Sequence, residues 1–337
     1  MHGYPALPRT HPLDVLKLMA SKYDKFRRML MWEPRGHQNM FGALLLPPSR
    51  PDTRFGVVFM DSGSYLKMCV HGLIGVTVAA VETGHISECE ANQPLRVETP
   101  AGIVSVRFER RPGLGIEVAV RNVTAFCADT DLTVEVDGKQ FPVDVVYSGN
   151  FFALVKAADL RLHLEPGDLA EITRVGLAIR DAINQHRQFV HPEQPEIAGV
   201  ALVEVYEDLR NPPPHARNVV VFGSGQIDRS ACGTGTCAKM ALLHSRGALQ
   251  LGEEFVHEGI VGTRFRGRLL EQNHVGEFSG VVPEVTGAAY VTGIQQFVVD
   301  PSDPLRAGFT LCDERVQLQR ARVAHRDSET TKQLPFR

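Results

Sequence analysis

The chain has 337 residues, of which 43% are hydrophobic and 22% are charged, and its formal net charge is -3. This length suits two ordinary domains with sizeable cores, and the small net charge gives no electrostatic reason to expect a nucleic acid or an anionic membrane as a partner. No apolar run reaches the roughly 18 residues of a membrane-spanning helix, and residues 1–12 lack the basic and then apolar pattern of a signal peptide, so we expect a cytoplasmic protein.

The first third of the chain predicts helix, strands and a second helix. Apolar positions at helical spacing predict an amphipathic helix over residues 12–30, and strands are expected at 40–46 and 56–60. Residues 70–82, which follow Cys69, are almost entirely apolar, which is typical of a helix buried in a core. Their valine and threonine content would also allow a strand.

The middle of the chain alternates between apolar and polar residues over 96–146, which predicts successive strands joined by turns. A Pro-Gly turn at 166–167 and Asp168 as a helix N-cap predict a helix that runs to about residue 188. Strands at 201–207 and 218–222 should follow.

The last third predicts another helix, which begins after Cys232 and ends at Gly247. It is followed by predicted strands at about 254–271, 275–284, 286–293 and 295–299, and by a polar, loose tail over 321–337.

Six cysteines are spread along the chain, at positions 69, 89, 127, 232, 237 and 312. None forms a CxxC pair, so we expect neither a disulfide framework nor a zinc site. Most of these cysteines should be small, buried core residues. Two of them have neighbours that indicate more.

The surroundings of Cys69 and Cys232 repeat. Each cysteine lies 15 residues before a glycine, Gly84 or Gly247, and each is preceded by a polar segment that contains glycine and followed by an apolar helix. The repeat predicts two related domains with one thiol at the N-terminus of each central helix. There the helix dipole and the unpaired N–H groups should lower the thiol pKa. The alternative is two ordinary core cysteines at helix starts.

Small and polar residues follow Cys232. Gly233 and Gly235 allow a ligand to approach the backbone, and Thr234 and Thr236 add hydroxyl donors. Two such helix ends that face each other would clamp one carboxylate. Such a turn could also cradle a phosphate, but the chain has no GxxxxGK[ST] motif and no GxGxxG motif after a strand, so nucleotide binding is disfavoured.

At this point the residues resemble a known family. DRSACGTGT (residues 228–236) resembles the DRSPCGTGT signature of the proline racemase family, and MCVHG (68–72) looks like its MCGHG. Further matches run over residues 5–312, and they are EPRGH (33–37), YSGNFFALV (147–155), GTRFRG (262–267), VTGAAYVTG (285–293) and DPSDPLRAGF (300–309).

The resemblance implies the diaminopimelate-epimerase-like α/β (α+β) fold, with two similar domains, each a strongly curved, mostly antiparallel sheet around a central apolar helix. Applied to this chain, it predicts a first domain over 1–146, completed by a returning segment at 298–320, and a second domain over 147–297. It also implies cofactor-independent inversion at Cα of proline or 4-hydroxyproline, with no metal, and a homodimer is one assembly that the sequence allows.

In that chemistry Cys69 and Cys232 would be the acid/base pair on opposite faces of Cα. By the family pattern His71 and Asp228 would contact the substrate's secondary ammonium. The carboxylate would be held by backbone N–H groups of the segments His71–Gly72 and Gly233–Thr234.

Three features depart from the family pattern. Val70 stands where the family has glycine, and it would be costly if that position needs a positive φ or close ligand approach. Ala231 replaces a proline, which we expect to be tolerated. The family also begins with a strand that carries an HTxGEP-like motif, whereas Met1–Arg9 corresponds to the sequence after it. Either the sequence as given is shortened or its start is misplaced, or the first domain has lost an opening strand.

Several functions therefore stay open. Proline racemase is the first hypothesis, and 4-hydroxyproline 2-epimerase is the alternative. The resemblance associates threonine at the second catalytic position with trans-3-hydroxyproline dehydratases, so Cys232 argues against that activity. An inactive, amino-acid-binding member is the remaining hypothesis.

Overall fold

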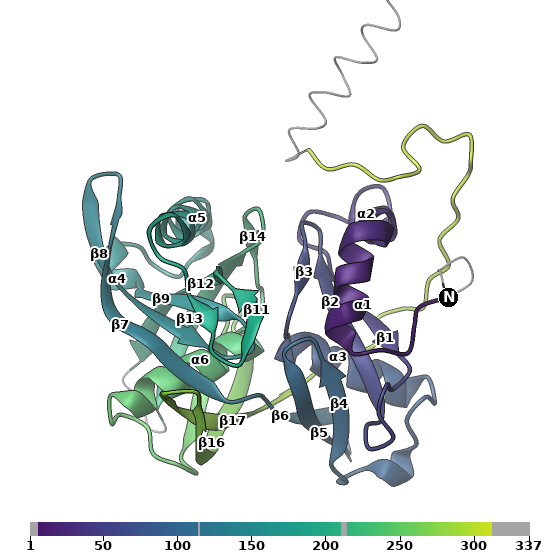
Figure 1. Ribbon diagram of the computed structural model, residues 1–337, viewed down its shortest axis with the longest axis horizontal. Coiled ribbons are helices and arrows are strands. Elements are labelled where there is room, and N and C mark those ends of the chain that lie inside the picture. Colours follow the sequence, from purple (N-terminus) through teal and green to yellow (C-terminus); the bar gives the residue numbers. More distant parts are fainter. Residues whose placement is uncertain (1–5, 114, 210–213, 312–337) are drawn as a thin grey trace, which may run out of the picture.

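The computed structural model describes residues 6–113, 115–209 and 214–311. They form two lobes, each with a strongly curved sheet around one central helix (Figure 1), and the two sheets are continuous because β6 of the first lobe pairs with β17 of the second. The predicted α/β fold class is therefore confirmed. Among the described residues, no helix is both long enough and apolar enough to cross a membrane.

The first lobe opens with the predicted helical run. It consists of α1 (Pro12–Leu18), a π-helical turn (Met19–Tyr23) and α2 (Asp24–Met31). His11 caps α1 by accepting a hydrogen bond from the backbone N–H of Leu13, and buried Val15 and Leu16 pack with strands of the sheet.

The sheet of the first lobe runs in the order β1-β2-β4-β5-β6, with the short β3 beside β2. Its strands are β1 (Phe41–Leu46), β2 (Phe55–Asp61), β3 (Tyr65–Leu66), β4 (Leu95–Thr99), β5 (Gly102–Arg111) and β6 (Gly115–Arg121). It curves around α3 (Val70–Glu82), so the apolar segment after Cys69 is a helix and not a strand.

The sheet of the second lobe closes on itself around α6 (Gly233–Ser245), because β17 pairs with β16 on one side and with β7 on the other. Its strands are β7 (Ala125–Val136), β8 (Lys139–Tyr147), β9 (Phe151–Lys156), β12 (Val200–Leu209), β13 (His215–Phe222), β15 (Glu254–Glu258), β16 (Arg264–Val275) and β17 (Phe278–Ala288).

Shorter elements complete this lobe, and they are α4 (Ala157–Leu160), α5 (Leu169–His186), β10 (Val190–His191), β11 (Gln194–Ala198) and β14 (Gln226–Ile227). Asp168 stands at the N-cap of α5, as predicted, but its carboxylate accepts a hydrogen bond from the N–H of His163 instead of capping the helix.

The two central helices have the same design. α3 and α6 each span 13 residues, and each has its cysteine at the N-cap. Each also ends at a glycine with positive φ, +75° at Gly84 and +71° at Gly247, which a residue with a side chain adopts only with strain. The helices and their glycine ends are thus as the repeated sequence pattern predicts.

The lobes divide the chain differently from the predicted boundary at residue 146. β7 and β8 were predicted to belong to the first domain, but they complete the sheet around α6 in the second lobe (Figure 1). The reason is the pairing of β7 with β17, which are more than 140 residues apart in the sequence, and no local pattern reveals such a contact.

The chain returns to the first lobe near its C-terminal end. Glu33 and Phe309 exchange two backbone hydrogen bonds (3.1 and 3.0 Å), and the Arg35 guanidinium donates to the carbonyl of Arg306 (2.6 Å). The described part of the predicted returning segment thus contacts the first lobe, whereas the predicted tail over 321–337 lies outside the described residues.

The predicted strands at 286–293 and 295–299 are wrong beyond residue 288. β17 ends at Ala288, and residues 289–299 belong to no helix or strand. Tyr290, Ile294 and Val298 are 72, 85 and 79% exposed. Apolar alternation predicts a strand only where the edge of a sheet is available, and among the described residues no strand is assigned after β17.

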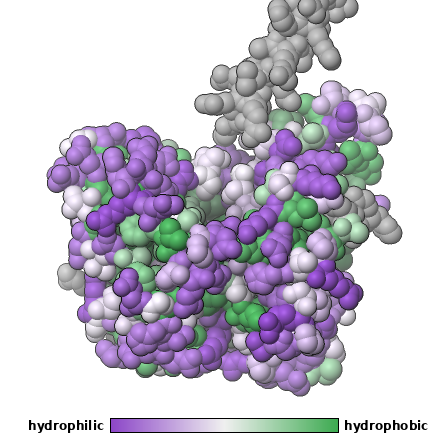
Figure 2. Space-filling view, in the orientation of Figure 1, coloured by the Kyte–Doolittle hydropathy of each residue, from purple (hydrophilic) through white to green (hydrophobic). Residues whose placement is uncertain are grey.

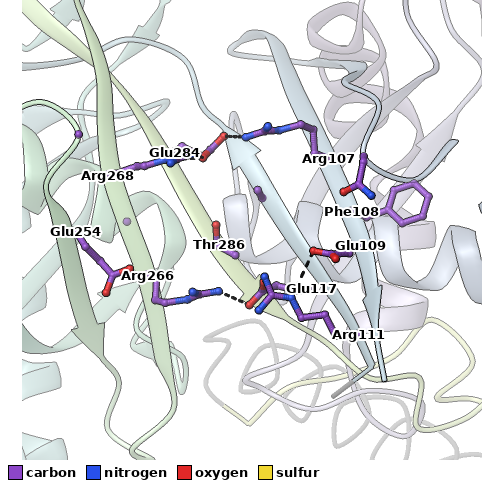
Figure 3. Close-up of a pocket in the computed structure, with 14 residues that line it drawn as sticks. Arg107, Phe108, Glu109, Arg111, Glu117, Glu254, Arg266, Arg268, Glu284 and Thr286 are labelled. Atoms are coloured by element: carbon purple, nitrogen blue, oxygen red, sulfur yellow. Dashed lines mark hydrogen bonds and ion pairs between the residues drawn. The ribbon is translucent and has the colours of Figure 1, made fainter. Parts of the chain in front are cut away.

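Ion pairs fasten the lobes together beside β17 (Figure 3). Glu284 on β17 is almost fully buried and accepts hydrogen bonds from Arg107 on β5 (2.7 Å) and Arg268 on β16 (2.6 Å). Glu117 on β6 pairs in the same way with Arg111 on β5 (2.7 Å) and Arg266 on β16 (2.5 Å). Each glutamate therefore connects strands of both lobes.

We expect Glu284→Gln to lower the free energy of unfolding by about 1–3 kcal/mol, because it removes the charge that two guanidinium groups share. Urea denaturation of the two proteins measures this. Glu271→Gln is the matched control: Glu271 pairs with Arg121 at a site where both side chains are about half exposed, so the loss there should stay below about 1 kcal/mol. Equal losses in the two variants would contradict a special role for Glu284.

Candidate active site

The N-terminal ends of α3 and α6 meet between the lobes. A side-chain carbon placed on Gly233, the first residue of α6, would stand 2.7 Å from Val70 and 3.0 Å from the backbone nitrogen of His71, both at the start of α3. A cavity of about 470 Å³ opens beside this contact and is lined by both Cys69 and Cys232. Figure 2 shows the hollow between the lobes, with apolar residues inside a largely hydrophilic surface.

Both thiols accept a hydrogen bond from the first turn of their own helix. The Sγ of Cys69 accepts from the N–H of Gly72 (3.1 Å), and the Sγ of Cys232 accepts from the N–H of Gly235 (3.3 Å). Cys69 is half-buried, whereas Cys232 is only 4% exposed. Two N-cap thiols from different lobes thus point into one cavity.

The backbone of Cys232 is strained and that of Cys69 is not. Cys232 has φ +48°, a conformation that costs a residue with a side chain about 1–3 kcal/mol, whereas Cys69 is extended at φ -148°. A short chain of hydrogen bonds supports Cys232. Its N–H donates to the Ser230 hydroxyl (3.1 Å), and Ser230 donates from its N–H (2.8 Å) and its hydroxyl (2.9 Å) to the Asp228 carboxylate.

The helix ends act on the thiols in the predicted direction, but the predicted net lowering of the two thiol pKa values is wrong. Burial raises the pKa of Cys69 to about 12 and that of Cys232 well above its usual value. The N–H groups of Gly72 and Gly235 act in the opposite direction but are weaker, and the nearby Asp228 carboxylate raises both pKa values further. In the protein alone, both thiols therefore hold their protons at neutral pH.

His71 and Asp228 lie next to each other in the same cavity. The Nδ1 of His71 lies 3.7 Å from the Oδ1 of Asp228. Burial lowers the pKa of His71, but the Asp228 carboxylate outweighs it, so the net shift is upward. Burial likewise raises the pKa of Asp228, but His71 and Ser230 outweigh it, so that pKa is lowered. Asp228 is therefore an ionised carboxylate beside two neutral thiols.

Comparison with known proteins identifies the family of the chain. The sequence model of the proline racemase family matches residues 1–310. This chain belongs to the proline racemase family. By that membership it is an isomerase of the racemase and epimerase class, as the sequence analysis predicted.

Individual relatives of this proline racemase family member match along almost their whole length. The proline racemase of Acetoanaerobium sticklandii is 42% identical over 311 residues, which cover 92% of this chain and 93% of the relative. The 4-hydroxyproline 2-epimerase of Streptosporangium roseum is 41% identical over 310 residues, which cover 92% of this chain and 93% of the relative.

A solved structure also matches. A hydroxyproline epimerase from Agrobacterium vitis, with bound trans-4-hydroxy-L-proline, superposes with a TM-score of 0.86 at 32% identity, covering 93% of this chain and 91% of that one. The predicted diaminopimelate-epimerase-like fold is therefore confirmed.

The structure brings most of the predicted site residues of this proline racemase family member together. Those that line the cavity are Cys69, His71, Gly72, Asp228 and Cys232. The other two, Gly233 and Thr234, are not among the lining side chains and follow Cys232 directly in the first turn of α6. Thr234 is 3% exposed, its hydroxyl lies 3.7 Å from the Sγ of Cys232, and its carbonyl accepts a hydrogen bond from the Ser148 hydroxyl (2.9 Å).

The cost expected at Val70 does not arise from the backbone. Val70 is the first residue of α3 and is not among the residues with positive φ. Its side chain is fully buried and packs against Gly233 of the other helix. Valine therefore fills a contact between the lobes without strain.

The apolar wall of the cavity was not predicted from the sequence, and it includes Phe41, Leu66, Leu202, Phe222 and Ile227. Phe41 on β1 and Phe222 on β13 stack edge to face across the two lobes, with their ring centroids 6.4 Å apart. Phe222 ends a predicted strand shortly before the DRSACGTGT motif, but periodicity does not tell which face of that strand meets the cavity.

Hydrogen bonds between side chains and loops also join the two lobes. The Arg229 guanidinium donates to the carbonyl of Asn39 (3.2 Å), and the Gln226 amide donates to the Ser62 hydroxyl. Within the part of the chain that the structure describes, no group of three or more His, Cys, Asp or Glu side chains is arranged to hold a metal ion.

Proposed function

We propose that this protein inverts the Cα configuration of proline without a cofactor, with Cys69 and Cys232 as the two acid/base groups. The observation that carries the proposal is the pair of N-cap thiols, one from each lobe, that line a single cavity with Asp228. An acid and a base on opposite faces of one carbon allow inversion, whereas one group alone would return the proton to the same face.

The ionised Asp228 and its neighbour His71 are the proposed contacts of the substrate's secondary ammonium. The proposed carboxylate donors are backbone N–H groups of residues 71–72 and 233–234, at two helix N-termini where anions are favoured. These contacts would hold the proline ring with its Cα between the sulfur atoms.

Binding of the ammonium also supplies a way to activate the thiols. The Asp228 charge raises the pKa of both cysteines, so a cation that neutralises Asp228 should lower both values. One thiolate then removes the Cα proton, and the electron pair stays on the substrate, stabilised by the ammonium and by hydrogen bonds to the carboxylate. The other thiol protonates the opposite face, and the reverse reaction exchanges the two roles.

The apolar wall favours proline over 4-hydroxyproline. Phe41, Leu66, Leu202, Phe222 and Ile227 offer no side-chain hydrogen-bond partner. A ring hydroxyl buried against them would lose its hydrogen bonds to water, which costs about 1–3 kcal/mol. The polar edge near Asn39 and Arg229 is where a hydroxyl could find a partner, and together with the matching hydroxyproline epimerase structure it keeps the 4-hydroxyproline 2-epimerase as the second candidate.

Proton NMR in heavy water tests the proposal. With L-proline we expect the Cα proton signal to disappear and D-proline to form, with kcat/KM at least about tenfold higher than for trans-4-hydroxy-L-proline. A preference for the hydroxylated substrate would select the epimerase instead. A cyclic imine product from trans-3-hydroxyproline would indicate the dehydratase, and binding without exchange of the Cα proton would indicate an inactive member.

A further inference from the structure

A buried acid and a buried base lie behind the N-terminus of α6, away from the cavity. Glu204 on β12 and His257 on β15 are both fully buried, and the Oε1 of Glu204 lies 3.5 Å from the Nε2 of His257. Among the described residues, none lies in hydrogen-bond geometry with these two atoms or with the Oε2 of Glu204, although the Asn218 side chain lies near enough to lower the pKa of Glu204. Buried polar atoms of this kind are costly and rare, so the pair calls for an explanation.

The carboxyl group of Glu204 contacts the turn that holds Cys232. A side-chain carbon on Gly235 would collide with the Oε2 of Glu204 and would stand 3.2 Å from the Sγ of Cys232. The missing side chain of Gly235 therefore lets the carboxyl group reach the turn beside the thiol. The N–H of the same glycine donates to that sulfur.

His257 reaches Cys232 by a second route. Its Nδ1 lies 3.0 Å from the hydroxyl of Thr236, and that hydroxyl lies 2.9 Å from the carbonyl oxygen of Cys232, to which it can donate. The pair therefore contacts the Cys232 turn both beside the thiol, through Gly235, and at the backbone, through Thr236.

The charge of Lys239 acts on both members of the pair: it lowers the pKa of His257 further, and it lowers that of Glu204 by less than burial raises it. Lys239 on α6 forms an ion pair with Asp208 on β12 (2.7 Å), and its Nζ lies 3.3 Å from the centre of the Tyr206 ring. On β13, His215 lies 3.7 Å from Glu258. On the cavity side of Cys232 the titratable groups that act on it are Asp228 and Cys69.

We propose that Glu204 and His257 are positioning residues that share one proton and set the acidity of the Cys232 thiol from behind α6. The role of Cys232 as an acid/base group rests on the proposed function, but the location of the pair does not. The first lobe has no such arrangement: among the described residues the groups that act on Cys69 are Asp228 and the N–H groups of His71 and Gly72, so Cys69 is an internal control.

The pKa directions fix where the proton resides. Burial raises the pKa of Glu204 to about 8, and burial lowers the pKa of His257 well below its usual value. At pH 7 Glu204 is therefore mostly protonated and His257 is neutral. Above pH 8 Glu204 becomes an anion, and its charge then raises the pKa of Cys232 and opposes thiolate formation.

The test is the rate at which iodoacetamide alkylates each cysteine, measured by mass spectrometry of peptides from wild-type protein and Glu204→Gln. At pH 7 we expect the two proteins to alkylate Cys232 at similar rates. At pH 9 the variant should react at least about fivefold faster at Cys232, because its glutamine cannot ionise, while Cys69 in the same sample stays unchanged. Glu207→Gln, on the same strand, is the matched control and should match the wild type.

An equal rate ratio at pH 7 and pH 9, or an equal change at Cys69, would overturn the proposal. A second measurement uses the wild-type protein alone, so it does not depend on whether a variant folds. The infrared carbonyl band of the protonated Glu204 carboxyl group should be present at pH 7 and disappear near pH 8. Its absence at pH 7 would also overturn the proposal. Neither measurement uses a substrate, so a failure to invert proline would count against the proposed function alone.

Discussion

Cys69→Ser and Cys232→Ser should each lower the rate of proline inversion by at least about 10³-fold while the protein stays folded. A serine hydroxyl has nearly the shape of a thiol but is a far weaker acid, so it supplies neither the base nor the acid of a proton transfer at carbon. Because both groups act in each turnover, the loss should be of similar size in either variant and in both directions of the reaction.

Two further cysteines provide controls. Cys89 is exposed, and Cys127 lies on β7 with its thiol near the hydroxyl of Ser245 (3.4 Å). Cys89→Ser and Cys127→Ser should keep inversion within about threefold of the wild type. Polarimetry measures inversion, and circular dichroism checks the fold of each variant. Turnover near the wild-type value in either Cys69→Ser or Cys232→Ser would exclude the two-thiol mechanism.

Local patterns were sufficient to predict the parts of the site that local sequence builds. The N-cap cysteines, the helices that follow them and the terminating Gly84 and Gly247 are each encoded within about 15 residues, and the structure has all of them. The position of β7 and β8 in the second lobe depends instead on the pairing of β7 with β17. These two strands are too far apart in the sequence for any local pattern to reveal their contact.

The acidity of the thiols could not be predicted for a related reason. A helix N-terminus is visible in the sequence, but the burial that outweighs it results from two lobes that pack together. Glu204 was missed because it alternates with Val203 and Val205, a pattern typical of a strand residue that faces solvent. In a sheet that closes around α6, that face points at the helix, and the polar residue is in the interior.

The contact between the two helix ends leads to the second large prediction. Gly233→Ala should lower kcat by about 10²-fold, because its methyl group would stand 2.7 Å from two carbon atoms of Val70. The ends of α3 and α6 must then separate, and the thiols they carry separate with them. Displacements of about 1 Å between reacting groups cost rates of this order.

Adding Val70→Gly to Gly233→Ala should raise kcat at least about tenfold above that of Gly233→Ala alone, because it removes both valine carbons that the new methyl group meets. The contact with the backbone nitrogen of His71 (3.0 Å) remains, so the rescue should be incomplete. Val70→Gly alone keeps the helix ends in place and should stay within about threefold of the wild-type kcat. A double variant no faster than Gly233→Ala would mean that the alanine acts on something other than the distance between the lobes. Rescue would instead identify the contact between residues 70 and 233 as the spacer that sets the separation of the two sulfur atoms.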